Sequence, residues 1–285
     1  MGKSMLGGYV QVEYTQPTGS PLRKNGNFDI HRMVLFIGHK FNEKASFFTE
    51  WEVEHANEFW IEQAFLEYAV GKTNNLRTGL IIIPMGIVNE YHEPTTFNGV
   101  TRPEMDKVII PTTWREIGSG FAGRDLKRSI NYQMYVTNGG LSYADNDPSK
   151  LISGKNGIRN TRQKGVKPVM SGHPNFSGKI NYYGMKGMNI GLAAFQGRTQ
   201  STAYNGIERG SLEERTMADS TTVGMSMLGL DYRYKNKKFT SRGQIIYAGL
   251  KGASAYNAKV IDNQAKPDYI GSEMLGYYLE VAYDV

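Results

Sequence analysis

The 285-residue chain contains no cysteine, which excludes disulfides, thiolate metal sites and a cysteine nucleophile. It also lacks any stretch approaching the roughly 18–20 apolar residues that a membrane-spanning helix needs, and its apolar runs, such as Met33 to Ile37 and Leu80 to Ile83, are only four or five residues long. Residues Met1 to Val10 are too few and too rich in glycine to hold the apolar core of a secretory signal. We therefore expect no α-helical membrane protein, and if the protein is exported, its signal peptide is absent from this chain.

Sequence motifs for catalysis and metal binding are missing as well. The five histidines are His31, His39, His55, His92 and His173, and no two of them have a metal-ligand spacing such as H-x-x-x-H. No local motif indicates a Ser-His-Asp arrangement, and no basic block or aromatic RNA-binding motif is present. We therefore expect no catalytic residue, no metal site, no cofactor and no nucleic-acid partner.

One glycine pattern resembles a binding motif. Gly118 to Gly123 fits G-x-G-x-x-G, but a dinucleotide site also needs a following helix and an acidic residue about twenty positions further on. Here Arg124 to Arg128 leads directly into another strand-like segment. The pattern therefore favours a glycine-rich strand in which neighbouring backbones approach closely.

The residues that are abundant favour β-structure. Aromatic residues make up 12% of the chain, tyrosine occurs 18 times and glycine 33 times, which is typical of strands joined by tight turns. The mean hydropathy of −0.46 resembles that of a soluble protein, but it does not exclude a membrane barrel, because only alternate residues of each strand face lipid. The net charge of +6 fits either ordinary surface charge or an anion-attracting surface or channel.

Alternating hydrophobicity predicts about twelve strands. In one of the clearest, Ala45–His55, the three glutamates Glu50, Glu52 and Glu54 share a face. The segment Phe59–Val70 fits a strand or a helix by pattern, and its aromatic content favours a strand. The other predicted strands are 6–14, 28–38, 76–83, 117–122, 129–137, 176–185, 189–198, 222–234, 239–250 and 274–284.

The segment from Pro84 to Glu116 follows the fifth predicted strand and has neither helical nor alternating periodicity. Loops of this length are uncommon in compact domains unless they have a function. The segment carries apolar residues such as Trp114, which need packing partners, together with several cations and carboxylates. This mixture suits a loop folded inside a wide, water-filled β-barrel, where it would narrow the pore.

Strand length and loop pattern both favour a membrane barrel. The predicted strands have about nine to twelve residues, close to the roughly 9–11 residues of a tilted membrane strand. Short turns at His39, Gly71, Lys186 and Lys235 alternate with long loops, as they do around an outer-membrane barrel. We predict an all-β fold, an antiparallel transmembrane β-barrel that forms one domain over residues 1–285. A soluble β-sandwich that binds carbohydrate is the alternative.

Three segments, in order, resemble the phosphate-selective porin O and P family, especially its Bacteroidetes members: GLIIIPMGIVNEYHEPTTFNGVTRP, IIPTTWREIGSGFAG and INYQMYVTNG. The resemblance runs from about Phe28 to Asn138 and more weakly to Val285. It implies a sixteen-stranded, homotrimeric porin in the lipid of the Gram-negative outer membrane. In that family the loop after the fifth strand forms the constriction, and this position coincides with residues 84–116.

The chain departs from the family in two ways. Only about twelve strands are predicted, and the chain ends at Val285 without the terminal aromatic residue typical of such barrels. We therefore expect about four C-terminal strands to be missing, with a closed twelve-stranded barrel as the alternative. The arginine ladder and lysine cluster of the selective members cannot be mapped onto this sequence residue by residue, so phosphate selectivity does not follow from the resemblance.

The expected function is passive diffusion of small hydrophilic solutes or ions, with an anion preference as a further hypothesis. A plugged barrel that docks in an envelope assembly is the alternative. Three glutamates on one strand face would be costly in a dry core but not in a wet lumen, where wall and loop cations would offset them and set ion selectivity. The same charges could instead serve only to solvate the lumen. The candidate pore residues are Glu50, Glu52, Glu54, Arg77, His92, Arg102, Lys107, Arg115, Lys179 and Arg242.

Overall fold

A computed structural model describes residues 3–19, 21–99, 101–145, 147–165 and 167–284. Twelve strands form one large sheet, and a short pair, β8 (Leu141–Tyr143) with β11 (Gln200–Ser201), lies outside it. The strands of the sheet are β1 (Lys3–Thr15), β2 (Asn27–Lys40), β3 (Ala45–Glu54), β4 (Glu58–Ala69), β5 (Asn74–Ile82), β6 (Arg115–Asp125), β7 (Ile130–Thr137), β9 (Asn175–Tyr182), β10 (Met188–Arg198), β12 (Gly224–Asn236), β13 (Phe239–Lys251) and β14 (Glu273–Tyr283). None of the helices in this part of the chain has the length and apolar content that crossing a membrane requires.

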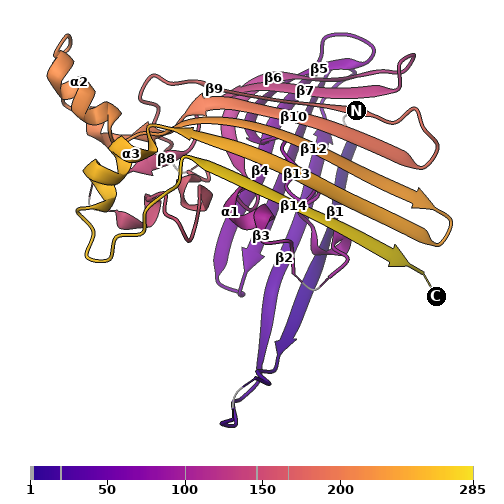
Figure 1. The fold of residues 1–285 in the computed structure, drawn as a ribbon. Helices are drawn as coiled ribbons and strands as arrows, with labels where there is room; N and C mark the ends of the chain where they lie inside the picture. The colour runs from indigo at the N-terminus through magenta and orange to yellow at the C-terminus, as the bar shows by residue number, and fades with distance from the viewer. Residues whose placement is uncertain (1–2, 20, 100, 146, 166, 285) are drawn as a thin grey trace.

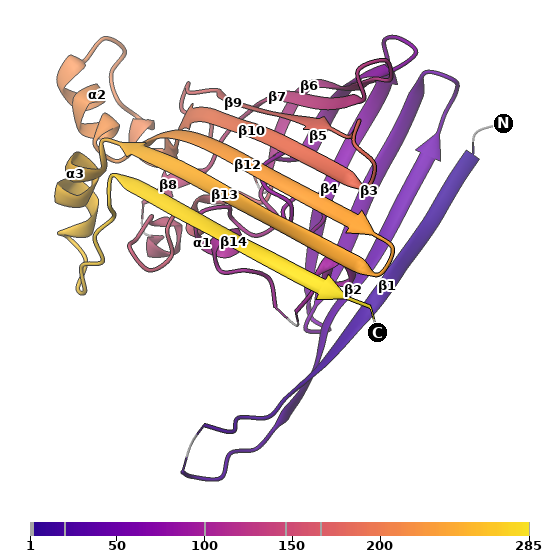
Figure 2. The same ribbon diagram turned by 45° about the vertical axis from the view of Figure 1, so that its right-hand side comes forward.

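The strands follow one another in the sheet in chain order, and each pairs antiparallel with the next. Among the described residues, β1 and β14 each pair with one neighbour and form the two edges of the sheet (Figure 2). The twelve predicted strands are confirmed, with ends shifted by a few residues, and the ambiguous segment 59–70 is strand β4. A single sheet of this width contradicts the β-sandwich alternative, which requires two sheets packed face to face.

Short and long connections alternate along the chain, as the sequence predicts. One end of the sheet, the short-turn rim, carries the connections 41–44, 70–73, 126–129, 183–187 and 237–238. The other end, the long-loop rim, carries the connections 16–26, 55–57, 83–114, 138–174, 199–223 and 252–272. Only 55–57 is short at this rim, and α2 (Leu212–Asp219) and α3 (Ala253–Tyr256) lie close together there (Figure 1).

The two faces of the sheet have different surroundings. On the outward face large apolar side chains remain exposed, for example Leu275, Tyr277 and Leu279 of β14, at 62%, 76% and 68%. Similar exposed residues occur on the other strands, among them Leu192 of β10 and Leu228 of β12. Alternating residues turn to the inward face, where loops cover many of them. Such a broad apolar surface fits contact with lipid, because alternate side chains of a barrel strand face the bilayer.

The loop 83–114 lies against the inward face, and the sheet curves around its short helix α1 (Met105–Val108) in Figures 1 and 2. Apolar loop residues such as Ile83 and Trp114 are fully buried in the main apolar cluster of the described chain. The ring of Trp114 lies 4.7 Å, centroid to centroid, from that of Phe195 on β10. This packing explains how a long loop without strand or helix periodicity follows one defined path.

The C-terminal limit of this loop differs from the prediction. Strand β6 begins at Arg115, so Arg115 and Glu116 belong to the sheet and not to the loop that was predicted over 84–116. Pairing with Ile81 and Ile82 of β5 holds both residues in the strand. Alternation did not indicate this strand end, because Trp114, Arg115 and Glu116 are all buried.

The long loops contain helices that the sequence interpretation left as irregular structure. Helix α2 has a local signal, since the side chain of Ser211 accepts a hydrogen bond from the backbone N–H of Glu214. Ser-x-x-Glu is the pattern of a capping box, which satisfies free backbone donors at a helix start. Helix α3 follows Gly252, whose φ of 89° lies in the left-handed region that favours glycine.

The glycine pattern in β6 is a site of close backbone contact. A Cβ atom added to Gly118 would lie 2.2 Å from the carbonyl oxygen of Val136, and one added to Gly120 would lie 2.0 Å from that of Met134. Both contacts are with the paired strand β7. The glycines are therefore required by strand packing, as the sequence interpretation proposed.

Candidate functional site

A charged cavity of about 450 Å³ lies where the inward face of β1–β4 meets the loops 83–114 and 138–174. Its lining combines seven arginines and lysines with four glutamates and two histidines. These residues are Arg32, Arg102, Lys107, Arg115, Arg159, Arg162, Lys164, Glu13, Glu52, Glu54, Glu62, His31 and His55. The cavity thus brings together five of the ten candidate pore residues, namely Glu52, Glu54, Arg102, Lys107 and Arg115.

Two buried ion pairs form the strand side of the cavity. Arg32 Nη1 lies 2.8 Å from Glu52 Oε1, and Arg115 Nη1 lies 2.9 Å from Glu62 Oε2. Glu62 faces inward because the register between β3 and β4 shifts by one residue at this point. A β-bulge of this kind redirects side chains that strict alternation would place on the other face.

The loop side of the cavity is cationic. The guanidinium of Arg102 lies 5.3 Å from the ring centroid of Phe97, and Lys164 Nζ lies 3.6 Å from that of Trp60. Both arrangements place a cation over an aromatic face, which is favourable. The aromatic rings therefore hold two loop cations at the cavity wall.

These cations are close enough to repel one another. Burial, reinforced by the charge of Arg32, lowers the pKa of Arg102 to about 10. Burial, reinforced by the charges of Arg115 and Arg159, lowers the pKa of Arg162 to about 10. Both groups still carry their charge at neutral pH, so the cavity concentrates positive charge in a region of restricted solvent.

Some guanidinium nitrogens of the cavity have no hydrogen-bond partner among the described residues. They are Arg32 Nε, Arg102 Nη1 and Arg115 Nε, and all three atoms are buried. An unsatisfied buried donor costs roughly 1–3 kcal/mol, and more when it is charged. These three donors therefore carry a desolvation cost that no described residue offsets.

Two further candidates, Glu50 and His92, form a dry pair beside the cavity. His92 Nε2 lies 3.1 Å from Glu50 Oε1, and Gln63 Nε2 donates to Glu50 Oε2 at 2.7 Å. Burial disfavours the imidazolium, but the hydrogen bond and negative charge of Glu50 outweigh it and raise the pKa of His92. The lumen-exposed position expected for Glu50 is therefore wrong, because its side chain is inaccessible and attaches the loop to β3.

Lys179 and Arg242 also attach the loop to the wall. Lys179 Nζ is 2.6 Å from Glu90 Oε2 and 2.8 Å from Asp231 Oδ2, and it donates to the Gly86 carbonyl at 2.8 Å. Arg242 of β13 is paired with Glu280 and donates to a loop carbonyl at Thr96. Only 2% of Lys179 is exposed, so this residue acts on the loop and not directly on a solute.

Arg77 lies apart from the other candidates. Its Nε is 2.6 Å from Glu67 Oε2, and its Nη1 donates to the Tyr135 hydroxyl at 3.3 Å. It lines a separate hollow of about 320 Å³ with Lys72 and Arg124, close to the short-turn rim. The structure therefore divides the predicted set into cavity residues, loop anchors and one residue at the opposite end of the sheet.

Comparison with known proteins identifies the architecture. No family model matches the chain. An uncharacterized protein of Aquifex aeolicus is 31% identical over 291 residues, which cover 98% of this chain and 61% of that protein. The outer membrane channel DcaP of Acinetobacter baumannii superposes with a TM-score of 0.53 at 11% identity, covering 87% of this chain and 64% of that one. The anion-selective porin from Comamonas acidovorans gives a TM-score of 0.52 at 12% identity, covering 88% and 69%.

The chain has the fold of outer-membrane porins. It spans less than two thirds of the length of the Aquifex protein, at 61%, and of DcaP, at 64%. The two solved structures are an outer membrane channel and an anion-selective porin, and the expectation that this chain is not an enzyme stays a prediction.

Sequence reasoning missed several residues of the porin-fold cavity. Arg159, Arg162 and Lys164 lie in the loop 138–174, which has no pattern that shows which side chains turn inward. Glu62 lies at a bulge in β4, where alternation fails. The spacing of Glu62 from Glu58 and Glu67 does not show which face of the sheet it occupies. Only the pairing register between β3 and β4 places it at the cavity.

Proposed function

We propose that this chain forms part of a porin in the Gram-negative outer membrane and lets small hydrophilic solutes diffuse through the charged cavity. The observation that carries the proposal is the contrast between the two faces of one sheet. The outward face exposes apolar side chains suited to lipid, and the inward face of β1–β4 borders a polar, charged cavity. In this proposal the loop 83–114 is the constriction, because it narrows the space next to the wall.

We further propose that the pore prefers anions, with phosphate-like oxyanions as the best fit. Seven cationic side chains face four glutamates in the cavity. Arg32 and Arg115 are paired with Glu52 and Glu62, which leaves five cations and two glutamates. The guanidinium groups that line the cavity are of the kind that binds oxyanions through paired N–H donors. Rings and clusters of arginine and lysine are a general means of selecting anions in pores.

Membership of the phosphate-selective O and P type and assembly as a homotrimer are also proposals, and both rest on the sequence resemblance. The cluster of Arg102, Arg115, Arg159 and Arg162 supports the first, although it is built from two loops and one strand and not from a ladder along the wall. Native mass spectrometry of the detergent-extracted protein tests the second. A trimer mass is expected, and a strictly monomeric species contradicts it.

The decisive experiment is the reversal potential of the protein in planar bilayers under a salt gradient, with chloride and phosphate compared. The variant Arg102→Gln/Lys164→Gln removes two accessible cavity cations and is expected to reduce the anion preference. The matched control, Lys237→Gln/Lys238→Gln, makes the same change in net charge in an exposed turn of the short-turn rim. An unchanged reversal potential in the cavity variant, or an equal shift in both variants, contradicts selection by this cavity.

One observation favours the plugged docking barrel as a second candidate. The inward face of β10, β12 and β13 is filled by the loops in a fully buried apolar cluster. If this filling extended across the pore, the protein would not conduct. Single-channel recording separates the two candidates, since the diffusion proposal requires discrete current steps and the docking proposal requires none.

A further inference from the structure

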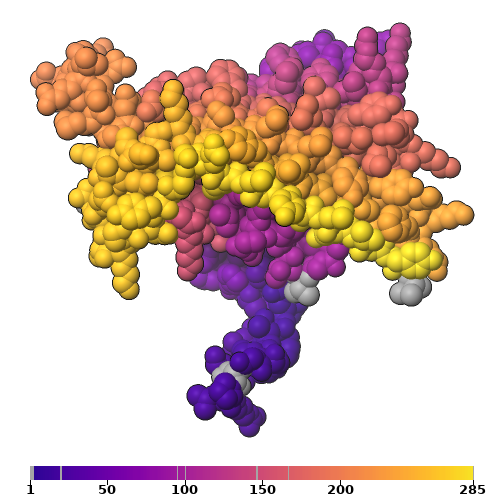
Figure 3. Space-filling model, in the orientation of Figure 1, coloured from indigo at the N-terminus to yellow at the C-terminus, as the bar shows by residue number. Residues whose placement is uncertain are grey.

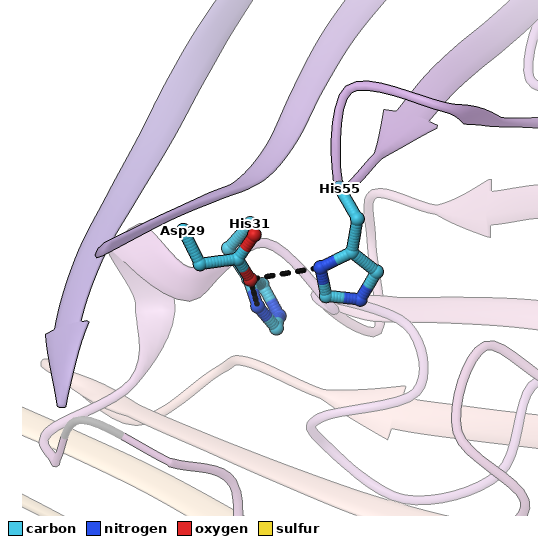
Figure 4. A group of neighbouring side chains, drawn as sticks. All are labelled: Asp29, His31 and His55. Carbon is cyan, nitrogen blue, oxygen red and sulfur yellow. Dashed lines mark hydrogen bonds and ion pairs between the residues drawn. The ribbon is translucent and has the colours of Figure 1, made fainter. Parts of the chain in front are cut away.

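Three titratable side chains meet at the long-loop rim, at one end of the charged cavity. Asp29 and His31 belong to β2, and His55 belongs to the turn between β3 and β4. The two imidazoles point toward the same carboxylate (Figure 4). Strand pairing causes this arrangement, because the backbone N–H of His55 donates to the carbonyl of His31 at 3.3 Å and places the two residues side by side. The sequence shows no sign of it, since His31 in β2 and His55 in the turn after β3 are far apart in the chain.

The structure assigns a divalent metal site to this group: we propose that Asp29, His31 and His55 bind a transition-metal ion such as Zn²⁺. Their potential ligand atoms all lie within 4.8 Å of one another. Neutral imidazole and carboxylate are ligands that Zn²⁺, Cu²⁺ and Ni²⁺ accept readily. The proposal does not depend on conduction through the pore.

The distances are close to those of a tetrahedral site. Two ligands that are each about 2.0–2.1 Å from Zn²⁺ lie roughly 3.4 Å apart at a tetrahedral angle. His31 Nδ1 and Asp29 Oδ2 are 3.4 Å apart, and His55 Nδ1 and Asp29 Oδ2 are 2.8 Å apart. Metal binding therefore requires the contact between His55 Nδ1 and Asp29 Oδ2 to open by about half an ångström. The two imidazole nitrogens, which lie within 4.8 Å of each other, must reach a similar separation. The side chains of His31, His55 and Asp29 are 29%, 51% and 37% exposed, which leaves room for this adjustment.

A fourth ligand is within reach. Glu13 of β1 pairs across the sheet with Asp29, and its Oε2 lies 3.8 Å from His31 Nδ1. The register between β1 and β2 shifts by one residue next to this pair, and both His31 and Arg32 then face the cavity. With Glu13 the donor set is two imidazoles and two carboxylates, which matches the four positions of a tetrahedral ion.

The backbone also holds His55 in an uncommon conformation. His55 and Ala56 both have positive φ, at 52° and 55°. Two consecutive positive values are typical of a tight hairpin turn that prefers asparagine and glycine. A histidine and an alanine there cost conformational energy, and strain of this kind is found where a side chain must be held in a defined position. The turn keeps the His55 imidazole over Asp29.

The test measures binding of Zn²⁺ alone to the detergent-solubilised protein by isothermal titration calorimetry, with Co²⁺ absorption as a report on ligand geometry. One ion per chain is expected. The variant His31→Ala/His55→Ala should lose at least about tenfold in affinity, since changes even outside the ligand shell cost 10–100-fold. The matched control is His39→Ala, because His39 lies at the other end of the same strand and is hydrogen-bonded to Ser4.

Heat-modifiable gel migration of each variant checks that the barrel remains folded. Asp29→Asn is a second variant that removes the shared carboxylate and keeps both imidazole rings. It should also weaken Zn²⁺ binding, so the test remains usable if the double variant does not fold. The proposal is overturned if the unaltered protein takes up no stoichiometric Zn²⁺, or if the site variants bind it as tightly as the His39→Ala control. Because no current is measured, either result is independent of whether the protein conducts.

Discussion

The inward face of the sheet has two regions of opposite character. Over β10, β12 and β13 it presents Phe195, Met225, Met227 and Ile246, which are at most 4% exposed and packed under loop residues. Over β1–β4 it presents glutamates, arginines and histidines around an open cavity. A large share of the inward wall is therefore a dry core, while the opposite part remains accessible to water.

A single loop serves both regions. Within α1, Met105 belongs to the apolar cluster and Lys107 lines the cavity. Asp106 lies between them and accepts a hydrogen bond from Gln244 of β13 at 2.8 Å. The apolar region thus fixes the loop, and this fixed position presents the cationic residues to the cavity. Changes in the first region should alter stability, and changes in the second should alter ion preference.

The largest expected effect on stability is that of Trp114→Ala in the apolar region. Removal of a fully buried aromatic side chain should lower the free energy of unfolding by about 3–5 kcal/mol, because a cavity remains beside Phe195. Urea unfolding monitored by gel migration measures this loss. Trp51→Ala on the outward face, where Trp51 is 39% exposed, is the control and should have a much smaller effect. Equal losses in the two variants would remove the distinction between a dry core and a lipid-facing surface.

Glu62→Gln should have a smaller effect on stability and a clear effect on ion preference. Its loss leaves Arg115 without its carboxylate partner and should cost about 1.5–3 kcal/mol. The cavity also becomes more positive, so the reversal potential should shift toward anions. Glu54→Gln gives the matched comparison, because Glu54 lines the same cavity and forms no ion pair within the part of the chain that the structure describes. It should shift ion preference without the loss of stability, and a stability loss in both variants would contradict this assignment.

The sequence alone did not show which residues make up these two regions of the inward face. Alternation along β3 and β14 correctly separated the two faces, because each strand is regular over about ten residues and side chains alternate with period two. No face was predicted for Glu62 or His31, and strict alternation does not give one, because a bulge beside each residue adds one position and exchanges the faces. Bulges depend on pairing between strands, so no local pattern announces them.

The loops posed a different limit. The apolar and charged composition of residues 84–116 correctly predicted a loop that packs against something, but not which cations would reach water. Lys179 and Arg242 were expected beside the pore and are buried as anchors, whereas Arg159 and Arg162 were overlooked and line the cavity. Which charge is paired and which is free depends on contacts between residues far apart in the chain. The capping box at Ser211 shows that some local signals were present and not used.

The smallest effect, within the interval from pH 6 to pH 8, is expected at the border between the two regions. Burial raises the pKa of Asp106 from its ordinary value of 3.8 to about 7. The folded state therefore binds a proton that the unfolded state releases, and the stability from this group is complete below about pH 4 and is lost as the pH rises through 7. Between pH 6 and 8 the loss should be about 1 kcal/mol.

Asp106→Asn should remove this pH dependence, because an amide keeps the shape of the carboxyl group and does not ionise. Unfolding free energies of the two proteins, measured at several pH values from 5 to 9, give the difference directly. The variant should gain stability relative to the unaltered protein as the pH rises from 5 to about 7, and the difference should level off above about pH 8. If the difference in unfolding free energy between the two proteins were constant from pH 5 to 9, Asp106 would be ionised throughout this range. The charge of Arg102 would then outweigh the effect of burial on the Asp106 carboxyl group.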